Sequence, residues 1–379
     1  MNICHIITRM IVGGAMENTL LTCEGLRRRG CDVSLITGPA LGPEGQLLDR
    51  AHAGGYRVEV VDSLRREIHP LRDRRALGCI SQLLRQIQPD IVHTHASKAG
   101  ILGRKAAANL ARSRIVHTVH GLPYHPYQSR LVNRLFIHLE RRAARRTDAL
   151  ISVADAMTAQ ALAAGIGRAQ QYTTIRSGMV VDRFCNRPDQ ADQWRQALRL
   201  PDNAVVVMQV SRIAPLKGHR FLLEAAEKID DQRVIFALVG DGPWFKQIAA
   251  EINERGLASR FRLTGLVEPE QIPALIHACD ILAHCSLREG LARALPQAML
   301  AGKPVISFDV DGAREVVDQD TGILLDAGDT VGLVAAIETL ADCPPLCRRL
   351  GQQGRARCTE MFDHNRMVDQ ILQLYRNLT

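Results

Sequence analysis

Two cations five positions apart suggest a phosphate-binding site. Arg212 and Lys217 lie in the segment Ser-Arg-Ile-Ala-Pro-Leu-Lys-Gly, which follows the apolar run 204–210 and precedes a helical pattern. Between a strand and a helix, such a pair can bind a diphosphate. Cations that are fixed in advance stabilise the charge of a departing phosphate without reorganisation. Two solvated surface cations are the alternative interpretation.

A carboxylate farther along the chain can hold sugar hydroxyls. Glu289 precedes Gly290, Leu291 and Ala292, where we expect a helix to begin, and a helix dipole favours negative charge at its start. Gln297 follows eight positions later, about two helical turns on. Its amide can accept one hydrogen bond and donate another. Glu289 is therefore a candidate to hold sugar hydroxyls from the start of a helix.

Histidines end two strand-like runs in the first half of the chain. His95 ends the run 90–95 and His120 ends the run 114–120. Ligands of open α/β sheets bind at the carboxyl ends of strands, so His120 is a candidate for catalysis. For His95 a contact with the acceptor and a structural role both stay open, and His93 and His117 are interpreted as structural.

Two glycines follow the first strand-like run. Gly13 and Gly14 precede the helical pattern 15–29, where their backbone N–H groups could approach a phosphate. A tight turn without a ligand is the alternative. The chain has no Gly-x-Gly-x-x-Gly at this place, which argues against a dinucleotide-dependent dehydrogenase.

No metal site is predicted. Asp309 and Asp311 could ligate Mg²⁺ or Mn²⁺, but capping of a following helix is the preferred role for Asp311. The ten cysteines include no Cys-x-x-Cys, and the nearest pair, Cys343 and Cys347, has no histidine nearby. Scattered cysteines of this kind are typically small buried residues.

Length and composition predict a two-domain globular protein. The 379 residues are 46% hydrophobic and 23% charged, and no apolar run approaches the ~18 residues that span a bilayer. The first eight residues lack the features of a signal peptide, so we expect a cytoplasmic protein. Residues 1–178 hold 25 Lys/Arg against 13 Asp/Glu, a net of +12, whereas residues 179–379 hold 23 against 27, a net of −4. The first half therefore is expected to face an anionic partner.

Strand-like runs alternate with helical patterns along the whole chain, which predicts two parallel sheets wrapped by helices. A boundary is expected between 178 and 203, with the first domain at 1–180, the second at 181–361, and a last helix at 362–379. Thirteen strands are expected, and their ranges are 2–8, 32–37, 57–62, 90–95, 114–120, 149–153, 173–177, 204–210, 234–239, 261–264, 281–283, 305–308 and 323–325.

A basic amphipathic helix is expected at 129–146. Four arginines share one face of it, at Arg130, Arg134, Arg141 and Arg145. An apolar stripe (Val132, Leu135, Phe136, Leu139, Ala143) lies nearly opposite, and packing of this stripe on the core with merely solvated arginines is one interpretation. The other is contact of the arginines with anionic lipid headgroups. Nucleic acid is disfavoured, because few aromatic residues are available for stacking.

These motifs resemble those of retaining glycosyltransferases of family 4, which carry the GT-B fold. The resemblance covers nearly the whole chain, and it is strongest to enzymes of bacterial surface-polysaccharide or lipopolysaccharide synthesis with His-Thr-His-x-x-Lys-Ala-Gly (93–100) and His-Thr-Val-His-Gly (117–121) segments. It implies two Rossmann-like domains that face one another across a cleft, with the last helix packed back on the first domain. It implies no cofactor beyond a nucleotide-diphosphate sugar as co-substrate.

The resemblance also implies roles for particular residues. His120, Arg212, Lys217 and Glu289 would be catalytic, and His95 and Lys98 would lie near the acceptor. Residues that would contact the donor are Gly13, Gly14, Gly240, Gly265, Gly290, Leu291, Ala292 and Gln297. The family usually has a second Glu where this chain has Gln297, which removes a charge-assisted hydrogen bond worth ~1 kcal/mol more than a neutral one.

The resemblance implies transfer of a sugar, with retention, to a glycan or lipid-linked acceptor. UDP is the preferred nucleotide, with GDP next. Two other functions stay open: a sugar-nucleotide epimerase on the same fold, and a non-catalytic nucleotide-sugar-binding scaffold. The substitution at Gln297 motivates the scaffold hypothesis, whereas the presence of the four candidate catalytic residues opposes it.

Overall fold

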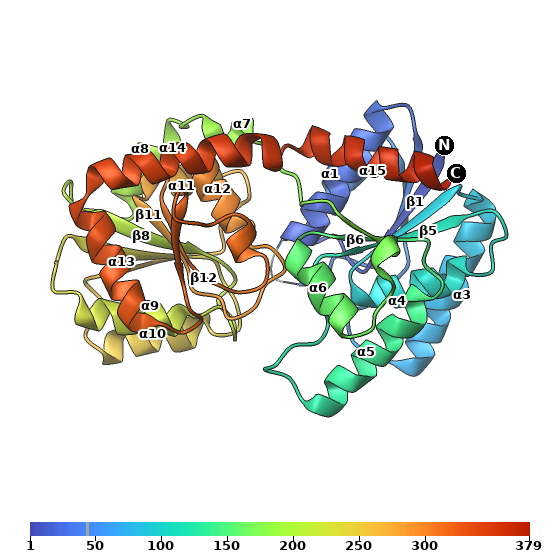
Figure 1. Cartoon of the computed structure of the whole chain (residues 1–379), viewed down its shortest axis with the longest axis horizontal. Helices are drawn as coiled ribbons and strands as arrows, with labels where there is room; N and C mark the ends of the chain where they lie inside the picture. Colours follow the sequence, from blue (N-terminus) through green and yellow to red (C-terminus); the bar gives the residue numbers. More distant parts are fainter. Residues whose placement is uncertain (43–44) are drawn as a thin grey trace. The chain divides into compact units, whose positions relative to one another are not determined.

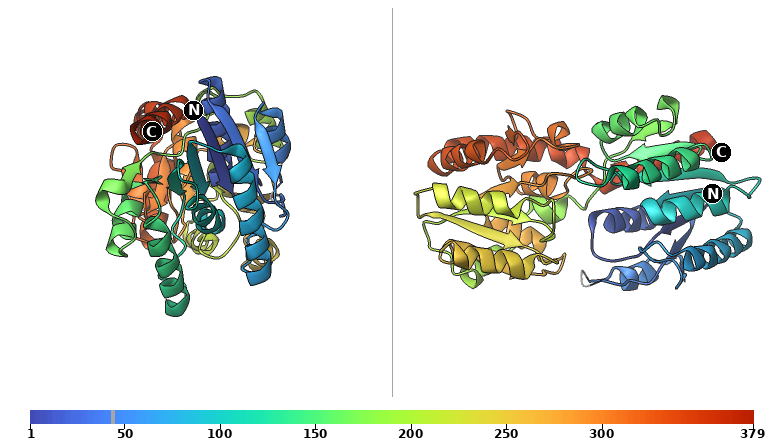
Figure 2. Two further views of the ribbon diagram at one scale, coloured as in Figure 1. Left: turned by 90° about the vertical axis from the view of Figure 1, so that its right-hand side faces the viewer. Right: turned by 90° about the horizontal axis from the view of Figure 1, so that it is seen from below.

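The computed structural model describes residues 1–42 and 45–379, which form two compact units (Figure 1). Unit 1 comprises Met1–Met179 together with His364–Thr379, and unit 2 comprises Val180–Asp363. Each unit is a parallel sheet with helices on both faces (Figures 1 and 2), so the predicted α/β architecture is confirmed.

The sheet of unit 1 has seven parallel strands in the order β3-β2-β1-β4-β5-β6-β7. Its central strands are buried over nearly their whole length, although they carry histidines and a threonine among their apolar residues. The strands are β1 (Asn2–Ile7), β2 (Asp32–Thr37), β3 (Arg57–Val60), β4 (Ile91–His95), β5 (Arg114–Val119), β6 (Ala149–Ser152) and β7 (Tyr172–Thr174). The helices of this unit are α1 (Gly14–Arg28), α2 (Leu48–Ala53), α3 (Pro70–Ile87), α4 (Ser97–Ala107), α5 (Arg130–Ala144), α6 (Asp155–Ala163), a short 3₁₀ turn η1 (Ala169–Gln171) and α15 (His364–Leu378).

The sheet of unit 2 has six parallel strands in the order β10-β9-β8-β11-β12-β13. They are β8 (Val205–Val210), β9 (Val234–Val239), β10 (Phe261–Gly265), β11 (Ile281–His284), β12 (Val305–Phe308) and β13 (Gly322–Leu325). The helices are α7 (Asp182–Cys185), α8 (Gln190–Ala197), α9 (His219–Lys228), α10 (Phe245–Glu254), α11 (Ile272–Ala278), α12 (Ala294–Leu300), a 3₁₀ turn η2 (Ala313–Glu315), α13 (Thr330–Asp342) and α14 (Pro344–Met361).

The strand order reverses once in each sheet, between β1 and β4 in unit 1 and between β8 and β11 in unit 2. Ligands of open α/β sheets bind beyond the carboxyl ends of the strands at such a reversal. In unit 1 the loop with Gly13 and the end of β4 at His95 lie at this point. In unit 2 it carries the loops 211–218 and 285–293.

Helix α15 returns to unit 1 after the chain has completed unit 2. It packs on α1, where Gly25 is needed because an added Cβ would lie 2.6 Å from Val368. The predicted stripe of Met367, Ile371, Leu372 and Tyr375 is buried. Asn18 of α1 donates to the sulfur of Met367, and Arg29, just after α1, bonds the carboxylate of Asp369 at 2.6 Å.

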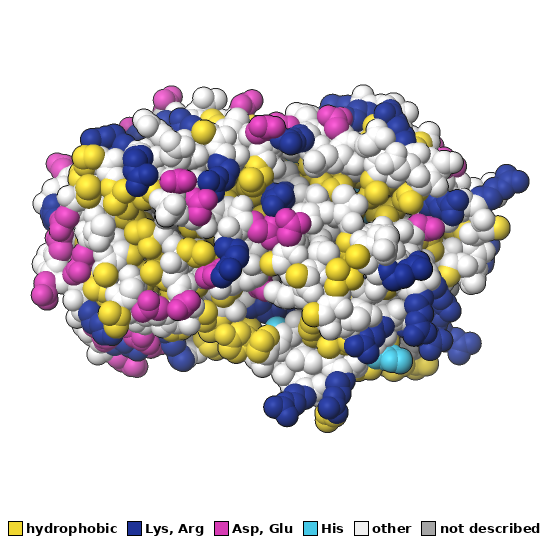
Figure 3. Space-filling view, viewed as in Figure 1, with side chains coloured by type: hydrophobic (Ala, Val, Ile, Leu, Met, Phe, Trp, Pro, Cys, Tyr) yellow, Lys and Arg dark blue, Asp and Glu magenta, His cyan; other side chains and the backbone are white. Residues whose placement is uncertain are grey.

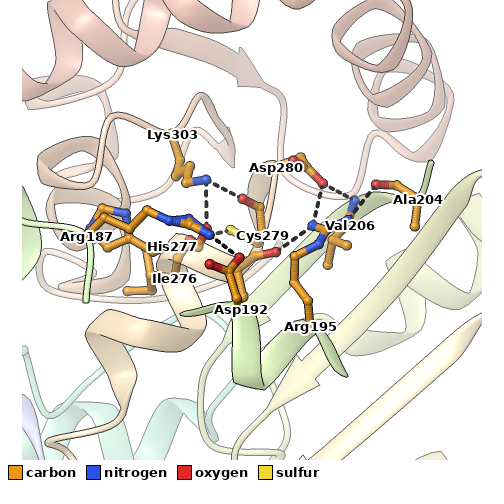
Figure 4. A network of polar contacts seen from close by, with 11 residues as sticks. Arg187, Asp192, Arg195, Ala204, Val206, Ile276, His277, Cys279, Asp280 and Lys303 are labelled. Carbon is orange, nitrogen blue, oxygen red and sulfur yellow. Dashed lines mark hydrogen bonds and ion pairs between the residues drawn. The ribbon is translucent and has the colours of Figure 1, made fainter. Parts of the chain in front are cut away.

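A polar network fixes the amino-terminal edge of the sheet in unit 2 (Figure 4). Asp280 accepts a hydrogen bond from the backbone N–H of Val206 at 2.8 Å, while Arg195 of α8 donates to the carbonyl of Ala278 at 2.9 Å. Lys303 donates to the carbonyls of His277 and Cys279. The network ties α8 and α11 to β8 and β11 at the edge opposite the loops 211–218 and 285–293.

In the part of the chain that the structure describes, no single helix is long and apolar enough to cross a bilayer. Among residues 1–42 and 45–379, α13 and α14 pass that test only as a pair, and they are bent by 103° relative to one another. The ten cysteines are free, and six of them are buried.

Candidate active site

The loop between β8 and α9 is held in a fixed shape by its own backbone. Leu216 has φ 67° and its carbonyl accepts from the N–H of Leu287 at 2.8 Å, while the carbonyl of Lys217 accepts from the side chain of Gln209 at 2.8 Å. Gly218 has φ 72°, and a Cβ there would lie 1.8 Å from the carbonyl oxygen of Cys285. Only glycine fits this position. The loop therefore presents Arg212, which is exposed, and Lys217, which is half-buried, from a rigid base.

Lys217 forms an ion pair with Glu289, so the structure brings together two predicted catalytic residues from loops 72 positions apart. The Nε2 atom of His284, at the end of β11, lies 3.3 Å from the same carboxylate oxygen. Burial opposes ionisation of Glu289, but Lys217 and His284 outweigh it and hold the pKa of this carboxyl well below its usual value. Glu289 is thus an anion that remains 19% exposed to solvent.

The expected helix start at Glu289 is wrong. Helix α12 begins at Ala294, so Glu289 lies in the loop before it and Gln297 lies on the helix. The carboxylate of Asp311 positions Glu289 instead, by accepting from its backbone N–H at 2.7 Å. The carbonyl of Gly290 accepts from the N–H of Gly312 at 3.1 Å. Loop–loop hydrogen bonds, rather than a helix dipole, hold the carboxylate in place.

Asp311 was expected to cap the following helix, but the cap position of the 3₁₀ turn η2 is Gly312, and the carboxylate of Asp311 accepts from the backbone of Glu289. Asp311 has φ 50°, a left-handed conformation that Asp tolerates better than most residues. Asp309 pairs with the guanidinium of Arg314, whose Nε lies 3.0 Å from one carboxylate oxygen. Both carboxylates of the sequence Asp-Val-Asp are thus engaged with protein groups.

The candidate donor-binding glycines of unit 2 lie at strand ends. Gly240 follows β9 with φ 135°, and a Cβ there would lie 2.2 Å from the carbonyl of Ser211. Its N–H donates to the carbonyl of Gly265, at the end of β10, at 3.1 Å. Leu291 is half-buried and Ala292 is buried in the loop before α12. These residues surround the carboxyl edge on which Lys217 and Glu289 lie.

In unit 1 the predicted histidines form a hydrogen-bonded row with a third one. The Nδ1 atom of His95 lies 3.1 Å from Nε2 of His120, and Nε2 of His95 lies 2.9 Å from Nδ1 of His5 in β1. His5 and His95 are buried, and burial lowers the pKa of His5 to about 3 and that of His95 well below its usual value. His120 is half-buried and lines a small pocket with Gly121, Leu122 and Tyr172.

A second row runs beside the first. His93 bonds Tyr375 of α15 through Nδ1 and Thr118 through Nε2, the latter at 2.7 Å. The ring of His93 packs against that of His95, with the centroids 4.2 Å apart. Nitrogens of His5, His93 and His95 lie close enough together to hold a metal ion. However, both nitrogens of His93 and of His95 already have hydrogen-bonding partners.

The other predicted residues of unit 1 have separate surroundings. Lys98 is paired with Asp73 of α3 at 2.6 Å. Gly13 has an extended backbone (φ 165°) just before α1, whose first residue is Gly14. Its carbonyl accepts the first helical hydrogen bond, from Glu17 at 2.9 Å. A Cβ on Gly13 would lie 2.6 Å from the terminal methyl of Met16.

The basic helix α5 is exposed in its first half and packed in its second. Two members of the predicted stripe, Val132 and Leu135, are 38% and 51% exposed, so this part of the stripe does not pack on the core, and the neighbouring Leu131 is 74% exposed. Arg130 and Arg134 are exposed beside them. Its second half is anchored: Glu140 forms a buried ion pair with Arg104 at 2.6 Å. Arg141 bonds the carbonyl of Ala164 at 2.7 Å, and Arg145 is exposed.

Sequence reasoning missed several residues that hold the site. His284 and Asp311 contact Glu289, and His5 ends the row that reaches His120. His5 and His284 each lie in a strand, where an imidazole has no local signal that distinguishes a structural from a functional role. Glu140 was detectable, because it is the one acid in a helix with four arginines.

Two family models cover most of the chain. Residues 190–357 match the model of glycosyl transferases group 1, and residues 13–178 match that of the glycosyl transferase 4-like domain. The 2-deoxystreptamine glucosyltransferase of Streptomyces kanamyceticus is 31% identical over 275 residues, which cover 69% of this chain and 71% of that protein. The chain belongs to this family of glycosyltransferases.

The family assignment confirms the resemblance and the prediction of an enzyme that transfers sugars. A further relative, the UDP-Gal:α-D-GlcNAc-diphosphoundecaprenol α-1,3-galactosyltransferase of Escherichia coli, is 28% identical over 98% of this chain and 96% of its own length. Solved structures with the same fold include HepE of Anabaena in complex with UDP-glucose (TM-score 0.85, 24% identity, 99% of both chains). Sucrose-phosphate synthase of Thermosynechococcus elongatus gives a TM-score of 0.86 at 22% identity, over 100% of this chain and 99% of its own. The GT-B fold is thereby confirmed.

Proposed function

We propose that this glycosyltransferase moves a sugar from a UDP-sugar, with retention, to a lipid-linked saccharide in the synthesis of a cell-surface polysaccharide or lipopolysaccharide. The observation that carries this proposal is the full-length similarity to a transferase named for UDP-galactose and a diphosphoundecaprenol-linked acceptor. A second relative, LpsD of Rhizobium meliloti, is named for lipopolysaccharide core biosynthesis and is 31% identical over 182 residues, which cover 48% of this chain and 52% of that protein.

Unit 2 supports the donor site. A diphosphate at the carboxyl edge of its sheet would meet Lys217 and Arg212 on a loop that cannot readily change shape, because Gly218 and the Leu216 carbonyl are fixed. Lys217 would then leave its ion pair with Glu289 and bind an oxygen of the phosphate. Glu289 would be released to accept hydrogen bonds from sugar hydroxyls, with its backbone still held by Asp311.

The reaction then breaks the bond between the anomeric carbon and the leaving phosphate oxygen. Lys217 and Arg212 stabilise the charge that develops on this oxygen, and the acceptor hydroxyl attacks from the same face and passes its proton to the departing phosphate. Removal of one preorganised donor of this kind lowers the rate by ~10²–10³-fold in other enzymes. We propose that His120 donates a hydrogen bond to the sugar near the reacting carbon. The proposed reaction has no covalent intermediate and needs no metal. The engagement of Asp309 and Asp311 with protein groups supports the latter choice.

Unit 1 supports an acceptor held at a membrane. Leu131, Val132 and Leu135 are exposed on the first half of α5, beside Arg130 and Arg134. Figure 3 shows basic side chains gathered, with hydrophobic ones among them, where α5 projects in Figure 1. We propose that this half-helix lies on the anionic surface of the cytoplasmic membrane, which would make the enzyme a peripheral one. Each cation near such a surface contributes about 1 kcal/mol, and the leucines can enter the interface.

The donor is tested by thermal stabilisation with UDP, GDP and ADP and their sugar conjugates, with and without EDTA. We expect stabilisation by the uridine series that persists in EDTA. Stabilisation that needs Mg²⁺ or Mn²⁺ would contradict the metal-free site, and stabilisation by GDP alone would contradict the nucleotide.

The transfer itself is tested with UDP-galactose, UDP-glucose and UDP-N-acetylglucosamine on a synthetic GlcNAc-diphospholipid, with the product anomer read by NMR. We expect an α-linked disaccharide from one donor. A β-linked product would contradict retention. Turnover of the sugar nucleotide to an isomer without acceptor would favour the epimerase, and no turnover despite UDP binding would favour the scaffold.

A further inference from the structure

The three histidines His5, His95 and His120 share two hydrogen bonds in one direction. Between His5 and His95 the atoms are Nδ1 and Nε2, and between His95 and His120 they are again Nδ1 and Nε2. A neutral imidazole carries one proton, so it donates from one nitrogen and accepts at the other. The position of the proton on any one ring therefore fixes its position on the other two.

Neutrality of the buried rings follows from their surroundings. His5 and His95 are fully buried with no carboxylate in hydrogen-bonding contact among the described residues, and burial lowers the pKa of each. The neighbouring imidazoles His93 and His120 disfavour a proton on His95 further. Both rings are therefore neutral over the ordinary pH range, and each carries one proton.

The direction of the row is decided at its buried end. The Nε2 atom of His5 is buried and has no hydrogen-bonding partner in residues 1–42 and 45–379. A proton there would bury an unpaired N–H, and such orphaned donors are rare in folded proteins. With the proton on Nδ1 instead, His5 donates to His95, and His95 in turn donates from Nδ1 to Nε2 of His120.

We propose that His5 and His95 are positioning residues that fix the proton of His120 on Nδ1, so that His120 offers a sugar a hydrogen-bond donor, Nδ1–H, and not an acceptor. The contact with the sugar rests on the proposed function, whereas the tautomer does not. His95 thereby acts through His120 and not on the acceptor.

His93 and its partners keep the ring of His95 in its orientation. His93 is bonded at both nitrogens, to Tyr375 and Thr118, and its ring packs on that of His95. Rotation of the His95 ring would break two hydrogen bonds and disturb this contact. The orientation of His120 is thus set through its Nε2 atom from the interior of the sheet.

The first test is NMR of the full-length protein labelled with ¹⁵N in its histidine rings, which distinguishes protonated from bare ring nitrogens. We expect Nδ1–H with bare Nε2 for His5, His95 and His120, assigned through single substitutions. Protonation of His120 at Nε2 would overturn the proposal. So would stoichiometric metal in the purified protein, because a metal on His5 and His95 would occupy the nitrogens that the hydrogen-bonded row needs.

The second test separates the hydrogen-bonded row from packing. His5→Asn keeps a donor near the position of Nδ1, whereas His5→Leu removes it, so we expect the His120 tautomer to persist only in the former. The kcat of transfer should fall about fivefold in His5→Leu, the equivalent of one neutral hydrogen bond, and recover in His5→Asn. Stabilisation by UDP, which reports on unit 2, should be the same in both.

A matched control lies on the next strand. His117 is buried at the same edge and bonds Thr94 through Nδ1, outside the row. His117→Asn should leave the His120 tautomer unchanged, and equal effects of His117→Asn and His5→Leu would overturn the proposal. Since the NMR experiment needs no substrate, Nδ1–H on His120 in a protein that transfers no sugar would support the hydrogen-bonded row while the proposed function fails.

Discussion

The carboxyl edges of the two sheets carry opposite kinds of chemistry. In unit 1 the edge is built from neutral imidazoles that bond one another and are mostly sealed from solvent. In unit 2 it carries an ion pair, Lys217–Glu289, in which both side chains keep contact with solvent. A charged ligand such as a diphosphate can bind where an ion pair is free to exchange partners, as at Lys217 and Glu289. The ring of His120, in contrast, is oriented by buried neighbours that stay neutral and fixed. One architecture thus serves both needs with different side chains at different depths of burial.

Acidification should destabilise unit 1 more than unit 2, and this is the largest effect that we expect. Burial lowers the pKa of His5, His93, His95 and His117 in unit 1, so below about pH 6.5 the unfolded chain binds protons that the folded unit excludes. Each such imidazole costs about 1.4 kcal/mol of stability per pH unit once the pH is below that value.

Unit 2 should respond less to the same change. It has two histidines of this kind, His219 and His277, and the lowered pKa of Glu289 stabilises it until the pH falls below the usual value of a glutamic acid. Hydrogen exchange read by mass spectrometry at pH 7 and pH 5.5 should show peptides of unit 1 losing protection first. Loss of protection in unit 2 before unit 1 would contradict this difference between the two units.

The ion pair is tested by Lys217→Ala. We expect kcat of sugar transfer to fall by ~10²–10³-fold, because the developing charge on the phosphate loses a preorganised cation. Lys228→Ala, an exposed lysine at the end of α9, is the matched control and should keep full activity. Comparable rates for Lys217→Ala and the control would remove Lys217 from the mechanism.

Membrane contact is a property expected of unit 1 only. The double change Arg130→Gln/Arg134→Gln should lower partitioning onto phosphatidylglycerol vesicles about 30-fold, since each cation contributes about 1 kcal/mol. Arg74→Gln/Arg75→Gln removes two exposed arginines from α3 and should have little effect. Equal losses in the two proteins, measured by sedimentation with vesicles, would point to net charge and not to α5.

The smallest effect that we expect is a loss of stability on removal of the hydroxyl of Tyr375 in unit 1. Tyr375→Phe removes the hydroxyl that bonds His93 and should lower the free energy of unfolding by about 1 kcal/mol, the contribution of one neutral hydrogen bond. Tyr127→Phe, at a tyrosine 53% exposed, should leave stability unchanged. Denaturant unfolding of the two variants provides the measurement.

The fold could be predicted closely because its strands are short runs rich in β-branched residues that alternate with helical patterns along the whole chain. Thirteen runs were expected and thirteen strands are present in the described residues. Loops were harder. The helix start expected at Glu289 lies five residues later, at Ala294, because hydrogen bonds from the distant loop at Asp311 and Gly312 hold the chain there.

The same limit applies to the histidines. The end of the run at His95 was recognisable, but its partners come from β1 and from the residue after β5. Such partners become neighbours only through the strand order, in which β1 and β4 lie side by side. A single sequence holds no local sign of that adjacency, whereas the loop 211–218 keeps its cations and its glycine within eight positions.

The return of α15 to unit 1 has a consequence for the order in which the protein is made. Unit 2 is continuous in the chain, so it can fold as soon as it leaves the ribosome. Unit 1 contains α15, which is synthesised after all of unit 2, and until then Gly25, His93 and the face of α1 lack their partners Val368 and Tyr375. The unit that is translated first is therefore the one that is completed last, and its unfinished surface must remain uncovered during the synthesis of the 184 residues of Val180–Asp363.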